Sequence, residues 1–113
     1  MARHLDPAAA RAVRIDGLYE HLMNSERAEI RRGDPRAMFI DDPAQRSAAN
    51  AASPVIKAAV AKLAAMERGE PQTVACWQLT GRTFGEQAPA IPWLTDRSVD
   101  HVRVTPDDRI TPV

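Results

Sequence analysis

The residues of this chain that could act as nucleophiles or metal ligands are few and scattered. Cys76 is the only cysteine, and the three histidines are His4, His21 and His101. A catalytic thiol needs a neighbouring group that lowers its pKa, and His101 on an adjacent predicted strand could be that neighbour. Metal sites need closely spaced ligands, but the chain has neither a C-x-x-C nor an H-x-x-x-H motif. We therefore expect a buried, unreactive thiol at Cys76 and no metal site.

Two pairs of adjacent carboxylates occur, at Asp41-Asp42 and Asp107-Asp108. General acid–base catalysis needs a buried carboxylate with a shifted pKa, whereas both pairs are typical of solvated turns. Asp42 precedes Pro43, a pattern typical of a helix N-terminus. The five glycines show none of the spacings that cradle phosphate groups. The sequence predicts no catalytic residues and no cofactor, and an enzyme is the less favoured interpretation.

Four arginines could contact the phosphates of a nucleic acid: Arg27, Arg31, Arg32 and Arg36. Nucleic-acid binding needs an excess of basic residues, but the chain has 15 basic and 15 acidic residues. Glutamates interleave with these arginines, and only five aromatic residues are present to stack on bases. A nucleic acid is the less favoured partner. A small nucleic-acid-binding regulator with an Arg-rich helical arm is kept as the alternative function.

The clearest secondary-structure pattern lies in the middle of the chain. Ser53 is a good N-cap, Pro54 suits the first helical position, and Gly69 is a good terminator. We predict a helix over about 54–68. Apolar residues recur along it at helical spacing and predict the buried stripe: Ile56, Val60, Leu63 and Ala64.

Further elements follow from the same kind of pattern. Helices are predicted over about 7–32 and 43–52, and strands over about 73–79 and 98–104. Period-two alternation predicts that one face of the first strand is buried: Ala75, Trp77 and Leu79.

N-terminal helices packed on a small C-terminal antiparallel sheet form an α+β fold. One hundred and thirteen residues is the size of one ordinary domain. We therefore expect a single small domain over 1–113, with residues 105–113 as an extended tail that could dock on a neighbour.

The apolar side chains predict a thin core. Hydrophobic residues make up 44% of the chain, but twenty of them are alanine, while Leu, Ile, Val and Phe together number twenty-two. Large apolar side chains supply most of the free energy of burial. The chain is therefore expected to need a protein partner or its own copies to complete its core.

The short apolar run Met38-Phe39-Ile40 has two interpretations. It either fills the space between the first helices and the central one, or it is exposed and docks on a partner. Met38, Phe39 and Ile40 are the residues we predict to bind protein, with Trp93 as a second contact.

Composition also bears on origin and compartment. Thirteen arginines against two lysines suggest a high-GC genome, and we expect a bacterial or phage protein. No apolar run approaches the ~20 residues of a membrane span, no apolar leader begins the chain, and the lone cysteine suits a reducing compartment. We expect a cytoplasmic, non-enzymatic interaction protein that serves as a subunit, adaptor or inhibitor of a larger assembly.

Overall fold

The computed structural model describes residues 13–79 and 99–113, and its fold is mixed α+β, as predicted. The chain divides into two compact units, which are described separately. The sheet unit comprises the chain up to Tyr19 together with Pro71–Val113, and the helical unit comprises Glu20–Glu70. None of the described helices is long and apolar enough to span a membrane. The expectation of a single domain stays a prediction.

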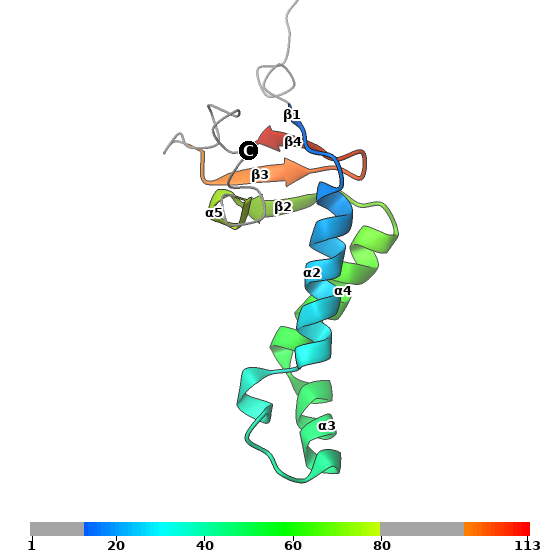
Figure 1. Cartoon of the computed structure of the whole chain (residues 1–113), viewed down its shortest axis with the longest axis vertical. Helices are drawn as coiled ribbons and strands as arrows, with labels where there is room; N and C mark the ends of the chain where they lie inside the picture. Colours follow the sequence, from blue (N-terminus) through cyan, green and yellow to red (C-terminus); the bar gives the residue numbers. More distant parts are fainter. Residues whose placement is uncertain (1–12, 80–98) are drawn as a thin grey trace, which may run out of the picture. The chain divides into compact units, whose positions relative to one another are not determined.

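Among the described residues, the sheet unit contains four antiparallel strands in the order β1-β4-β3-β2 (Figure 1). Their bounds are β1 (Val13–Arg14), β2 (Gln72–Ala75), β3 (His101–Val104) and β4 (Arg109–Pro112). Val102 lies opposite Val74 in β2, and Val104 lies opposite Ile110 in β4. All four of these side chains are buried, while His101 and Arg103 in the intervening positions of β3 are exposed. The alternation expected of a half-buried strand therefore holds in β3.

The hairpin between β3 and β4 also fixes the start of α2 (Leu18–Arg32). Asp108 closes the hairpin with a left-handed backbone, at a φ of 66°. Its Oδ2 accepts a hydrogen bond from the Gly17 N–H, and its Oδ1 accepts one from the Tyr19 N–H, both at 2.9 Å. These backbone donors have no acceptor within the helix, and a carboxylate also suits the positive end of the helix dipole. Asp108 therefore caps a helix that begins about ninety residues earlier.

The helix predicted over 7–32 is wrong at its beginning. Within the described residues, Val13 and Arg14 form a strand, and α2 starts only at Leu18. Gly17, at a φ of 79°, has a left-handed backbone that a right-handed helix cannot include. The part of this prediction before residue 13 lies outside the described residues.

The strand predicted over 73–79 ends early. β2 stops at Ala75, whose partner His101 is the first residue of β3, although the Cys76 N–H still donates to the Asp100 carbonyl oxygen at 2.9 Å. The next residues form the single helical turn α5 (Cys76–Leu79). The alternation between buried and exposed side chains therefore ends. Of the predicted buried face, Leu79 is buried, but Trp77 is 73% exposed, and Val74 and Cys76 on the opposite face are buried instead. The second predicted strand is shorter than expected, and part of the tail forms β4.

The helical unit contains most of α2, a short 3-10 helix η1 (Pro35–Ala37), α3 (Pro43–Ala52) and α4 (Pro54–Glu67). The predicted bounds of α3 and α4 are confirmed closely. Ser53 caps α4, because its Oγ accepts a hydrogen bond from the Ile56 N–H at 3.3 Å. Gly69 follows the helix at a φ of 81°, which favours glycine.

The buried face of α4 differs from the predicted stripe. The buried residues are Ile56, Ala59 and Met66, whereas Val60 is 49% exposed. Helix α3 has no buried residue. The helical unit thus buries few large side chains, which agrees with the thin core expected from composition.

Candidate functional site

The turn after α2 is built to bring η1 against α3. Gly33 has a φ of +78°, and a Cβ atom at this position would lie 2.7 Å from the Asn50 Oδ1. The next backbone N–H, that of Asp34, donates a hydrogen bond to the same Oδ1 at 2.8 Å. The backbone conformation therefore favours glycine here, and any side chain would also have to displace the Asn50 amide that binds the Asp34 N–H.

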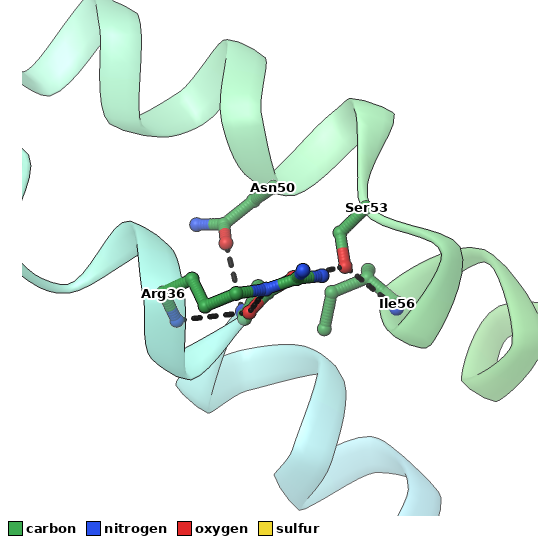
Figure 2. A network of polar contacts seen from close by, with 5 residues as sticks. Arg36, Asn50, Ser53 and Ile56 are labelled. Carbon is green, nitrogen blue, oxygen red and sulfur yellow. Dashed lines mark hydrogen bonds and ion pairs between the residues drawn. The ribbon is translucent and has the colours of Figure 1, made fainter.

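Asp34 is the centre of a polar network that joins η1 to the junction of α3 and α4 (Figure 2). Its Oδ1 accepts from the Arg36 N–H at 2.9 Å and the Arg36 Nε at 3.3 Å. Its Oδ2 accepts from the Arg36 Nη2 at 3.1 Å and the Ser53 Oγ at 2.7 Å. Ser53 thus acts twice, since it donates to Asp34 and also caps α4. The carboxylate is nearly inaccessible, with 6% of Asp34 exposed.

These contacts favour the charged form of Asp34. The Arg36 guanidinium, followed by the Ser53 hydroxyl and the Arg36 backbone N–H, holds the pKa of the Asp34 carboxyl well below its usual range. The hydrogen bonds to Asp34 in turn raise the pKa of Arg36. A group that is ionised and fully bonded in this way positions its neighbours and is unsuited to proton transfer at neutral pH.

The apolar segment, Met38-Phe39-Ile40, follows directly on this network. Met38 is 64% exposed and Phe39 is 82% exposed, so the interpretation of these two residues as core filling is wrong. Their backbone is nevertheless held at both ends. The Met38 N–H donates to the Pro35 carbonyl oxygen at 3.4 Å, and the Arg46 Nε donates to the Ile40 carbonyl oxygen at 2.8 Å. Two large apolar side chains thus face solvent from a fixed turn.

An open hollow of about 270 Å³ lies beside the apolar segment. Its walls include Asp34, Arg36, Ala37, Ile40, Ala49 and Ser53. Most of this wall is alanine and other apolar surface, with the bonded carboxylate at one side. Such a hollow can accept an apolar side chain. The Asp34 carboxylate in its wall already accepts hydrogen bonds from Arg36 and Ser53, so it is poorly suited to bind a polar ligand.

The four arginines predicted for the nucleic-acid alternative do not behave alike. Arg27 contacts the Glu20 carboxylate at 3.2 Å and the Asn24 side chain at 2.8 Å. Arg36 is paired with Asp34. Arg31 and Arg32 lie exposed in the last turn of α2, where positive charge suits the negative end of the helix dipole. Two of the four are therefore already paired with carboxylates.

Cys76 has the properties of an unreactive thiol. It is buried, and its backbone N–H donates to the Asp100 carbonyl oxygen at 2.9 Å. Burial, with the nearby Asp100 carboxylate, raises the pKa of the thiol, which disfavours the nucleophilic thiolate. His101 is exposed on β3, opposite Ala75. Among the described residues, no cluster of histidine, cysteine and carboxylate side chains is suited to hold a metal ion.

Of the residues predicted from sequence, Arg36 and Ile40 line the hollow, whereas Met38 and Phe39 do not. Trp93 lies outside the described residues. The sequence predicts a helix cap at Ser53 but no role for Asp34 or Asn50. A signal for Asp34 existed, because Asp34-Pro35 has the same cap-then-proline pattern as the residues that begin α3 and α4.

No protein-family model, curated protein or solved structure matches this chain. Function is therefore inferred from the geometry of the described residues.

Proposed function

We propose that this chain is a small non-enzymatic interaction protein, a subunit, adaptor or inhibitor of a bacterial or phage assembly. The apolar segment is its contact surface. The observation that carries the proposal is the exposure of Met38 and Phe39 on a turn whose backbone is hydrogen-bonded at both ends. A preorganised contact surface loses little conformational freedom on binding, and this favours affinity.

The chemistry of the segment suits a protein partner. Phenylalanine and methionine are enriched in the cores of protein interfaces, and an aromatic side chain buries a large area with few rotatable bonds. The hollow beside the segment can accept an apolar side chain of the partner. Arg36 and Asp41, which flank the segment, supply the polar rim that usually surrounds such an anchor.

The nucleic-acid alternative receives less support. Arg27 donates to the Glu20 carboxylate, and Arg36 donates to the Asp34 carboxylate. Of the four arginines, Arg31 and Arg32 are therefore the exposed pair not bound to these carboxylates. A phosphate contact would give a mobility shift that weakens steeply with salt. A shift that is absent or insensitive to salt removes this alternative.

The proposal is tested by replacing Met38 with a photoreactive residue and irradiating the chain in an extract of the cells that produce it. We expect cross-links to protein, either another copy or a different chain. The same residue in place of Val113, which is 74% exposed in the sheet unit, is the matched control and should cross-link much less.

Adding Phe39→Asp should remove the cross-links and leave the unfolding temperature almost unchanged, because Phe39 is a surface residue. Equal cross-linking at both positions would contradict the proposal. So would a Phe39→Asp chain that is unfolded but still cross-links, because the segment would then be core.

A further inference from the structure

The apolar segment lies between two regions of opposite charge. On its amino-terminal side, three arginines and one aspartate give a net charge of +2: Arg31, Arg32, Asp34 and Arg36. On its carboxyl-terminal side, two aspartates and one arginine give a net charge of −1: Asp41, Asp42 and Arg46. The stretch therefore has a basic end, an apolar middle and an acidic end.

We propose that the partner of this segment is a second copy of the same chain, paired about a two-fold axis with the segments antiparallel. This inference rests on the proposed function and names its partner. Antiparallel pairing places the basic end of each copy against the acidic end of the other, whereas parallel pairing opposes like charges. A two-fold contact uses the same surface on both copies, and this segment is complementary to itself in that orientation only.

The charged groups needed for this contact are available. Asp41 is exposed and takes part in no hydrogen bond or ion pair with the other residues that the structure describes. Arg36 binds Asp34 through Nε and Nη2, and its side chain is 78% exposed, so the outer nitrogen Nη1 can reach a carboxylate of a second copy. One carboxylate oxygen of Asp42 is already hydrogen-bonded, because its Oδ1 accepts from the Ala44 N–H at the start of α3.

The pairing also fixes which residues meet at the axis. If Arg36 of one copy faces Asp41 or Asp42 of the other, the midpoint of the pairing falls at Met38 and Phe39. These are the two most exposed large apolar side chains of the helical unit. Contact at the axis thus buries Met38 and Phe39, whose exposure to water is the least favourable. The hollow lined by Ala37 and Ile40 lies beside this contact.

The size of the surface predicts a weak dimer. A stable interface buries roughly 800 Å² on each partner, and one aromatic side chain supplies only about 150–250 Å². The apolar segment must therefore be supplemented by neighbouring exposed surface, such as that of α3, in which no residue is buried. We expect a reversible dimer that is populated only at high protein concentration.

The first test is sedimentation equilibrium of the full chain across a wide concentration range. Phe39→Ser should raise the dimer dissociation constant at least about 30-fold, because a symmetric dimer loses the anchor twice. Asp41→Lys should raise it about 10-fold at low salt, and the difference should shrink at about 0.5 M salt. Val113→Ser and Glu67→Lys make matched changes at exposed sites elsewhere and should have no effect.

The second test locates the axis. Met38→Cys should form a disulfide between equivalent positions of two copies on mild oxidation, since such a bond requires Cα atoms within about 7 Å. Val60→Cys, on an exposed part of α4, should not. Native Cys76 is buried and contributes little background.

A mass that stays monomeric, or a disulfide that forms equally well at both positions, would overturn the antiparallel dimer. If the photoreactive residue at position 38 still cross-links a different protein, the proposed function survives this result. If it cross-links nothing, both fail.

Discussion

The two units of this chain are stabilised in different ways. The five largest fully buried side chains among the described residues all belong to the sheet unit: Leu18, Leu79, Val102, Val104 and Ile110. The helical unit, which contains three of the longer elements, buries Ala37, Ile56, Ala59 and Met66 together with the polar Asp34 and Ser53. The sheet unit therefore depends on apolar burial, whereas the helical unit depends on helix caps and one polar network.

This difference indicates where the chain needs something from outside. Apolar burial stabilises a fold in proportion to the area removed from water, and the helical unit removes little. Its two most exposed large apolar side chains, Met38 and Phe39, could bury further apolar area only against another molecule. We interpret the helical unit as the part that association completes, and the sheet unit as the part that folds on its own burial.

The largest effect is expected from deleting apolar volume in the sheet unit. Ile110→Ala should lower the free energy of unfolding by about 2–5 kcal/mol, because Ile110 is fully buried and its removal leaves a cavity. Chemical denaturation measures this. Val113→Ala, three residues further on and 74% exposed, should cost less than about 0.5 kcal/mol. Similar costs for the two would mean that the sheet unit does not depend on burial.

A smaller effect is expected at the remote cap. Asp108→Ala removes both acceptors at the start of α2 and replaces a residue type that tolerates a left-handed backbone with one that tolerates it poorly, which together should cost about 2–3 kcal/mol. Asp108→Asn keeps an acceptor and tolerates that backbone, so it should cost less. Denaturation of both variants should give this order. Equal losses would show that the negative charge and the second acceptor of Asp108, which asparagine lacks, decide the cost.

The polar network around Asp34 should contribute less to the free energy of unfolding than the Asp108 cap does. Ser53→Ala removes the cap of α4 and one donor to Asp34, at a cost of about 1–2 kcal/mol. Hydrogen exchange should show faster opening in α3 and α4, with β3 unchanged. If β3 opens equally, the two units unfold together, and the comparison between them does not hold.

The smallest effect is expected from acid. Because its folded pKa is lowered, Asp34 contributes stability that is complete above its unfolded pKa of about 3.9 and is lost as the pH falls below it. The chain should therefore lose stability progressively as the pH falls below about 4, and Asp34→Asn should lose less over this interval.

Asp107 in the sheet unit also has a lowered pKa, chiefly because the Thr105 hydroxyl donates to it. It is exposed, so Asp107→Asn should change the acid profile less than Asp34→Asn does. An acid profile that is unchanged by Asp34→Asn would contradict the assignment of the network to stability.

Helix ends could be predicted from sequence where neighbouring residues determine them. Ser53-Pro54 and Asp42-Pro43 each combine a cap with a proline, and both helices begin where these pairs predict. The α+β fold followed from the same local patterns. The sheet was harder, because β1 is two residues long and is defined by pairing with β4 about ninety-five residues away. The end of β2 depends equally on where β3 begins, and no local pattern shows this.

The site could be predicted in part for the same reason. Met38, Phe39 and Ile40 form an apolar run that is visible in the sequence, and Arg36 belongs to a visible group of arginines. Their surroundings depend on contacts between residues 34, 50 and 53, which come together only after α3 has folded back on η1. The choice between core and surface for Met38 and Phe39 required this arrangement.

The measurement that tests the account most directly is hydrogen exchange of the native chain at a low and a high protein concentration. We predict that residues 36–42 gain protection at the higher concentration, while β3 is protected equally at both. The helical unit would then be completed by a second copy, and the sheet unit would be stable without one. Equal protection of residues 36–42 at both concentrations would contradict this account.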